Sequence, residues 1–172
     1  VIMQLSDVHV GRTIKRDFVD ELVQRVNAEN PDIVAITGDL IDYNIDDIKK
    51  DLLPLKGLVP PTYFILGNHE YFHGADATIE YIRSLGITVL LNESVQINTK
   101  AFSFNLLGLT DFVGARIGQH VMNIPKAYRQ ADPKLPTVVL AHQPKTILQL
   151  QGRACDLMLS GHTHGGQIFP FG

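Results

Sequence analysis

The stretch Ile33-Val34-Ala35-Ile36-Thr37-Gly38-Asp39 decides the fold class of this chain. Its four consecutive apolar residues predict a short strand. Gly38 permits a tight turn and a close approach of backbone, and Asp39 then places a carboxylate just beyond the strand. The segment therefore predicts a sheet whose strand ends carry polar groups.

Short apolar runs alternate with amphipathic stretches on both sides of this strand, which is the pattern of an α/β domain. Apolar runs predict further strands over residues 1–5 and 62–66. Phe18, Leu22 and Val26, spaced by four, predict a helix over residues 17–30 that ends at Pro31. Further helices are expected around residues 48–53 and over residues 76–85, the latter closed by Gly86.

The second half of the chain has a different character. Short polar turns separate the expected strands 87–91, 95–98 and 102–109, which favours antiparallel hairpins. An irregular segment follows over residues 110–136, and strands at 137–140 and 156–159 then bracket a helix at 146–151. Because no linker or repeat interrupts the pattern, we expect residues 1–172 to form a single domain with a mixed sheet system.

Composition narrows the classes of function. The chain has 172 residues, of which 45% are hydrophobic and 19% charged, as in ordinary globular proteins. A formal net charge of −3 gives little electrostatic support for binding a nucleic-acid duplex. The single cysteine, Cys155, excludes an internal disulfide and a thiolate metal cluster.

Both ends of the sequence resemble interior segments. Residues 1–5 begin inside a strand pattern, and residues 168–172 end without a closing element. We therefore expect a fragment of a longer chain, with C-terminal strands missing. No apolar run approaches the roughly 20 residues that span a bilayer, and the compartment stays open.

Polar blocks follow five of the expected strands. They contain the side chains Asp7, His9, Asp39, Asn68, His142, His162 and His164. Ligands in open α/β sheets gather outside the carboxyl ends of strands, so these groups are expected to meet at one centre. Glycines at positions 38, 67 and 161 directly precede three of the blocks.

The types of side chain indicate a metal centre. Carboxylate oxygens suit Mg, Mn or Fe, and imidazoles suit Zn, Fe, Mn or Ni. Seven groups exceed what one tetrahedral ion can use. Two ions about 3.5–4 Å apart that share one carboxylate would accommodate the set and could activate water for an in-line displacement.

These blocks resemble, in order and spacing, the motifs of the calcineurin-like metallophosphoesterases. The matching segments are Asp7-x-His9, Gly38-Asp39, Gly67-Asn68-His69-Glu70, His142 and Gly161-His162-Thr163-His164. Their flanking residues are most similar to the bacterial YkuE/YaeI-like branch. The resemblance implies a layered β-sandwich flanked by helices.

The resemblance also implies roles for individual residues. Asp7, His9 and His164 would hold the first metal ion, Asp39 would bridge, and Asn68, His142 and His162 would hold the second. His69 would act beside the phosphate as a general acid. Glu70 would orient a neighbouring histidine or shift its pKa. The ions would be Mn, Zn, Fe or a mixture.

The implied activity is hydrolysis of a phosphate ester by a metal-bridging hydroxide, and we favour a phosphodiester or a pyrophosphate. The expected partner is a small phosphate ester or a lipid-linked phosphate. Relatives in this branch often carry N-terminal anchors, which implies a cytoplasmic or membrane-associated full-length protein. Specificity is expected in residues 110–136 and in the loop after Glu70.

Other interpretations remain open at this stage. The site could be a metal-binding scaffold or interaction module without catalysis, and a dinuclear amidohydrolase would require an early His-x-His that is absent. Asp42 fits a turn or capping group. His73 and His120 fit solvated loop residues, and Asp111 is ambiguous.

Overall fold

The computed structural model describes residues 1–164, which form two four-stranded sheets. The first sheet is parallel throughout, in the order β1 (Ile2–Leu5), β2 (Ile33–Ile36), β3 (Thr62–Phe64) and β4 (Thr88–Val89). The second has the order β5 (Glu93–Asn98), β6 (Ser103–Gly108), β7 (Thr137–Leu140) and β8 (Leu157–Leu159). Only the β5–β6 pair is antiparallel within these described sheets.

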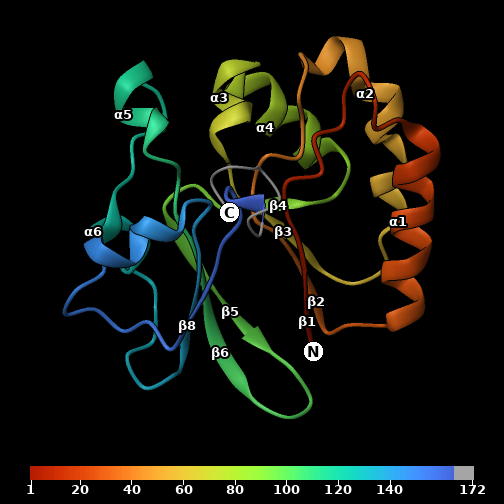
Figure 1. Ribbon diagram of the computed structural model, residues 1–172. Coiled ribbons are helices and arrows are strands. Elements are labelled where there is room, and N and C mark those ends of the chain that lie inside the picture. The colour runs from red at the N-terminus through yellow and green to blue at the C-terminus, as the bar shows by residue number, and fades with distance from the viewer. Residues whose placement is uncertain (165–172) are drawn as a thin grey trace.

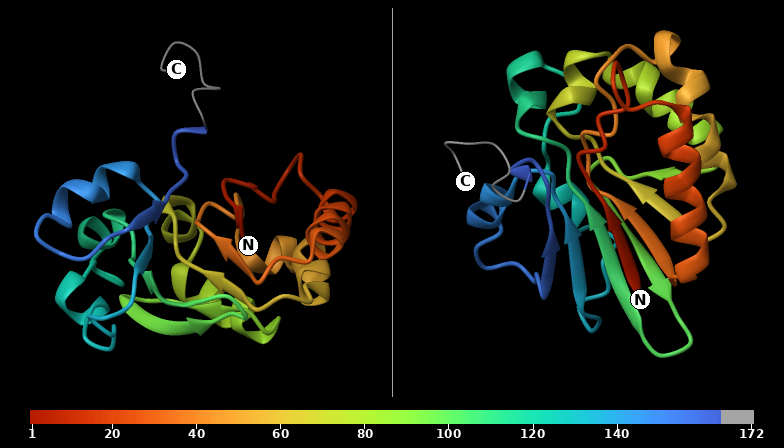
Figure 2. Two further views of the ribbon diagram at one scale, coloured as in Figure 1. Left: turned by 90° about the horizontal axis from the view of Figure 1, so that it is seen from below. Right: turned by 45° about the vertical axis from the view of Figure 1, so that its right-hand side comes forward.

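Helices cover both outer faces of this sandwich. They are α1 (Arg16–Glu29), α2 (Ile45–Leu52), α3 (Asn68–Phe72), α4 (Ala75–Ser84), α5 (Val113–Ile117) and α6 (Ile124–Ala127), with 3₁₀ turns η1 (Leu53–Gly57) and η2 (Pro144–Gln149). Figure 1 shows α1 and α2 on one side of the strands and α5 and α6 on the other. Both views in Figure 2 show the same separation. The expected α/β sandwich flanked by helices is confirmed.

The alternation of side chains along β2 explains why two sheets and a helical layer pack together. Val34 and Ile36 belong to the apolar cluster that contains the buried faces of α1, α2 and α4. Ile33 and Ala35 point the other way, into a cluster shared with Phe104 of the second sheet. The strand is therefore buried on both faces, which is why its sequence shows no polar interruption.

Helix α1 is predicted within one residue of its bounds, but its buried face is displaced. Val19, Val23 and Val26 pack against the sheet, whereas Phe18 is 47% exposed. The helix ends at Glu29 and is capped by Asn30, whose φ of 47° is left-handed, directly before Pro31. The spacing of four identified the helix correctly. The residues that it buries form a stripe next to the predicted one.

Several expected elements differ in the structure. Residues 88–89 pair in parallel with β3 in the first sheet, so the expected hairpin between this segment and β5 is wrong. The expected helix at 146–151 is a 3₁₀ turn over Pro144–Gln149. Helices α5 and α6 lie inside the segment expected to be irregular, and each spans five residues or fewer, too short for a periodic signal.

Further strands were expected after residues 168–172, and these residues lie outside the described part of the chain. None of the helices in the described part is long and apolar enough to cross a membrane.

Candidate metal centre

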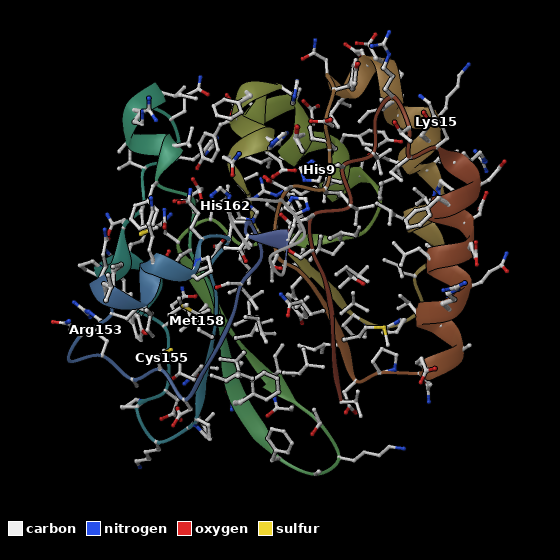
Figure 3. The ribbon with its side chains drawn as sticks, viewed as in Figure 1. His9, Lys15, Arg153, Cys155, Met158 and His162 are labelled. Carbon is white, nitrogen blue, oxygen red and sulfur yellow. The ribbon has the colours of Figure 1, made fainter. Side chains whose placement is uncertain are left out.

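The polar blocks meet at one edge of the sandwich, beyond the carboxyl ends of the strands. Asp7 and His9 follow β1, Asp39 follows β2, Asn68 follows β3, His142 follows β7, and His162 and His164 follow β8. Figure 3 shows His9 and His162 in the same upper region of the molecule, although their segments are far apart in sequence. The tertiary structure thus brings all seven predicted side chains to this edge.

Backbone hydrogen bonds join the first two loops. The amide of Asp7 donates to the carbonyl of Gly38 at 3.1 Å, and the amide of His9 donates to that of Asp39 at 3.1 Å. The parallel pairing of β1 and β2 therefore continues past the strand ends, and it holds the two ligand-bearing loops in register.

Several candidate ligands adopt a backbone conformation that is uncommon for residues other than glycine. Eight non-glycine residues in the described chain have positive φ, and five of them are Asp7, His9, Asp39, His162 and His164. Such strain persists only where the surrounding structure enforces it, and it concentrates at functional sites. His162 and His164 have left-handed φ, at 70° and 50°, so the segment that carries them is not extended.

Asp7, His9 and His164 form the first set of converging ligand atoms. One donor atom from each lies within 4.8 Å of the others. Nε2 of His9 is 3.2 Å from Nε2 of His164, which is in turn 3.5 Å from Oδ1 of Asp7.

Asp39, His142 and His162 form the second set under the same distance criterion. The amide oxygen of Asn68 lies 3.2 Å from Nε2 of His142 and extends the set. Nδ1 of His142 lies 2.8 Å from the carbonyl oxygen of Thr37. Because a carbonyl can only accept, Nδ1 carries the hydrogen and Nε2 is the atom that faces the other ligands.

Asp39 lies between the two sets. Its Oδ1 accepts the amide N–H of His69 at 2.9 Å, which leaves Oδ2 facing the centre. Oδ2 is 3.1 Å from Nε2 of His142 and 4.0 Å from Nε2 of His9. Asp39 is only 2% exposed, and this buried oxygen is placed to serve both sets.

The donor atoms fit divalent ions. Two ligands of one ion at metal distances near 2.1 Å are themselves about 3.0–3.4 Å apart in octahedral or tetrahedral geometry. The separations of 3.2 Å and 3.5 Å in the first set, and of 3.1 Å and 3.2 Å in the second, match that spacing. Imidazole, carboxylate and amide oxygen together suit Mn, Fe or Zn.

Burial and charge shift the pKa values of these groups in opposite directions. Burial works to lower the pKa of His142, but the hydrogen bond and the charge of Asp39 raise it to about 9. Burial works to raise the pKa of Asp39, and the contact with His142 lowers it below its usual value. For His9 and His162, burial is the largest effect and lowers the pKa. Without ions, the centre therefore holds a proton between Asp39 and His142.

His69, the predicted general acid, has a partner that the sequence interpretation missed. Nδ1 of His69 is 2.7 Å from Oδ1 of Asp42, and Nε2 is 3.9 Å from Oδ2 of Asp39. Asp42 also lies 3.9 Å from Nδ1 of His9. Its position three residues after Asp39 was visible in the sequence, but only the fold shows that it faces His69 rather than capping a turn.

Glu70 forms no hydrogen bond or ion pair with a histidine among the described residues, so the expected role is wrong. Its side chain is fully buried and accepts four backbone N–H groups, from Gly67, Asp39, Leu40 and Ile41. Burial raises its pKa to about 7; the charge of Asp39 adds to the rise and the backbone donors oppose it. Glu70 instead ties the loop after β2 to the loop after β3.

A hollow of about 360 Å³ borders the first ligand set and is lined by residues that include Asp7, Gly161 and His164. Two further hollows have none of the seven candidate ligands in their lining. One, of about 670 Å³, is lined by residues that include Asn44, His73 and Tyr81. Another, of about 600 Å³, is lined by Arg12, Lys15 and Tyr43, among others. The ring of Tyr43 stacks on that of His73, with centroids 6.2 Å apart.

Comparison with known proteins gives matches to one family. A family model described as calcineurin-like phosphoesterase matches residues 1–166. An uncharacterised metallophosphoesterase of Helicobacter pylori (strain J99) is 42% identical over 173 residues, covering 99% of this chain and 46% of that protein. The chain thus spans about half the length of the first relatives.

More distant relatives include bacterial and animal proteins. A bovine transmembrane protein with metallophosphoesterase domain is 37% identical, covering 98% of this chain and 41% of that protein. Phosphodiesterase YaeI of Escherichia coli (strain K12) is 29% identical, covering 97% of this chain and 61% of that protein. The resemblance to the YaeI-like branch is confirmed. A bacterial source of this chain is not confirmed, because similar proteins also occur in animals.

Proposed function

Because this chain belongs to the calcineurin-like phosphoesterase family, we propose that it hydrolyses a phosphate ester at a pair of divalent metal ions. The observation that supports two ions rather than one is the place of Asp39 between two ligand sets. A single ion would leave either Asp7 and His164 or His142 and His162 without a function.

The proposed chemistry divides between the ions and the side chains. Two divalent ions held by these ligands would supply a water-derived nucleophile and would offset negative charge on the phosphoryl oxygens. His69 stands beside the ligand sets with Nδ1 held by Asp42 and Nε2 free toward the centre. In the doubly protonated ring, Nδ1–H is held by Asp42 and Nε2–H is donated to the leaving alkoxide, as by a general acid; the ring is left neutral with its hydrogen on Nδ1. Asp42 keeps the ring in that orientation.

For the substrate, we favour a phosphodiester or a pyrophosphate over a monoester. The hollows beside His73 and Tyr43 give room for organic groups on the ester. The similarity to phosphodiesterase YaeI supports the same preference. A lipid-linked phosphate is a candidate substrate of the full-length protein, and the bovine relative named as a transmembrane protein supports a membrane-associated setting.

The test compares wild type with Asp39→Asn and His69→Ala on bis-aryl and mono-aryl phosphates in the presence of Mn²⁺ or Zn²⁺. We expect Asp39→Asn to lose bound metal and activity together, and His69→Ala to keep the metal and lose roughly 10²-fold or more in kcat. Full activity in either variant contradicts the proposal. Preference for the monoester contradicts only the choice of substrate.

A further inference from the structure

Asp111 is a buried carboxylate beside the second ligand set that the proposed chemistry does not use. It lies three residues beyond β6 and is 2% exposed. It is not among the side chains of the described residues whose ligand atoms converge. A buried acidic group in this position needs a physical reason, because its desolvation is costly unless a charge or hydrogen bonds compensate.

Only one of the two oxygens of this carboxylate has hydrogen-bond partners. Oδ1 accepts the amide N–H of Val113 at 2.9 Å and the side-chain N–H of Gln143 at 2.9 Å. Oδ2 is shielded from solvent and has no hydrogen-bond partner, and within residues 1–164 no cationic side chain forms an ion pair with Asp111. The uncompensated charge is the exceptional feature.

The fold connects Asp111 directly to the second set. Leu109 donates its amide N–H to the carbonyl of Leu140 at 3.0 Å, so the β6–β7 pairing continues toward the site. Gln143, which the carboxylate holds, is the neighbour of His142. The charge of Asp111 also reaches His162, where it opposes the burial that lowers the pKa of that ring.

The two ligand sets differ in negative charge, and Asp111 lies beside the set with fewer carboxylates. The first set contains Asp7 in addition to the shared Asp39. The second has Asp39 alone, with the neutral donors Asn68, His142 and His162. A divalent ion in the second set therefore lacks a carboxylate of its own, and a nearby anion would supply part of the missing charge.

We propose that Asp111 is a positioning residue for the second ligand set: it fixes the His142–Gln143 segment through Gln143 and contributes negative charge outside the ligand shell. This inference rests on the proposed pair of metal ions. On this inference, the buried negative charge of Asp111 balances a metal ion in the second set that the carboxylate does not contact.

Asp111→Asn separates this role from a purely structural one. The amide keeps an oxygen for Val113 and Gln143, so a structural role predicts no change in metal binding. The proposed role predicts that the second ion binds about 10–100-fold more weakly, because charge outside the ligand shell is lost. Isothermal titration with Mn²⁺ measures this, and an Asp7→Ala background isolates the second set.

Asp156→Asn is the matched control. Its carboxylate also accepts a backbone N–H, from Thr137 at 2.7 Å, but at the opposite end of β7. We expect it to bind Mn²⁺ as wild type does. The electron paramagnetic resonance signal of exchange-coupled Mn²⁺ pairs gives a second readout. In Asp111→Asn this signal should appear at a higher Mn²⁺ concentration than in wild type.

The outcomes distinguish the two proposals. If wild type binds two ions and Asp111→Asn binds both within threefold of wild-type affinity, the role of Asp111 is refuted and the metal centre stands. If wild type binds no divalent ion, the proposed function itself fails. Should Asp111→Asn not fold, Gln143→Ala replaces it; unchanged affinity for the second ion in that variant refutes the positioning role.

Discussion

Nδ1 of His69 lies 2.7 Å from Oδ1 of Asp42, and this contact orients the ring at the centre of the site. Because the carboxylate can only accept, the hydrogen is on Nδ1, and Nε2 is left facing Asp39. Asp42 is therefore part of the working site although it belongs to neither proposed metal shell. Other residues that contact the ligands without belonging to a metal shell hold them in place in the same way.

Asp42→Asn is expected to lower kcat by about 10–100-fold while leaving metal content unchanged, because the amide can hold the ring in the wrong tautomer. Steady-state kinetics on a bis-aryl phosphate and metal analysis measure the two effects. Asp20→Asn is the control, since Asp20 lies on α1 and pairs with Arg16. A wild-type kcat for Asp42→Asn would refute the role of this contact.

Gly67→Ala should disturb the centre through simple overlap. A Cβ at this position would lie 2.3 Å from Oδ1 of Asp39 and 2.5 Å from its amide nitrogen. We expect a loss of about 1–3 kcal/mol in the free energy of unfolding, as for overpacked cores, and weaker Mn²⁺ binding. Gly57→Ala is the control because its Cβ meets only Val23, at 3.4 Å. Equal stability and metal affinity in both variants would contradict the prediction.

Glu70→Ala should be among the more destabilising single substitutions, because it leaves four buried backbone N–H groups without an acceptor. A cost of at least about 3 kcal/mol in the free energy of unfolding is expected from the usual penalty per unsatisfied group. Urea denaturation measures it. Glu80→Gln, at an exposed position, should be neutral. A loss below 1 kcal/mol, on the order of a surface substitution, would show that water replaces the carboxylate.

Metal binding should release a proton from His142. The pKa of His142 in the metal-free protein is raised to about 9, so below that pH the ring carries a proton that an ion must displace. Apparent affinity should therefore fall as the pH decreases from about 9 toward 7. Calorimetry in two buffers with different ionisation enthalpies detects the proton. His120→Gln, which removes a histidine paired with Asp76, is the control. Binding heats that do not depend on the buffer would argue against proton release.

The same shift has a consequence for the metal-free protein. The folded pKa of His142 lies above its ordinary value of 6.5, so the pair with Asp39 contributes full stability below about pH 6.5. That contribution is lost as the pH rises through about 9. A metal-free melting temperature that increases over this interval would contradict the assignment.

Local patterns predicted much of the fold, and the misses have physical causes. Strands β2 and β7 and helix α1 were identified because continuous apolar runs and a spacing of four reflect their own burial. Strand β4 was paired wrongly because residues 88–89 are short and their partner, β3, is separated from them by α3 and α4. Pairing partners depend on the whole topology, which no window of sequence contains.

The sequence by itself determined the ligand types, their places after strands and the glycines that bring backbone together at Gly38 and Gly67. Those properties are local, since they depend on side-chain chemistry and on the absence of a Cβ. Only the tertiary structure decided that Asp39 lies between the two sets, that Asp42 orients His69 and that Glu70 joins two loops. Distances between residues about thirty positions apart follow from how two sheets pack, and packing is a property of the whole chain.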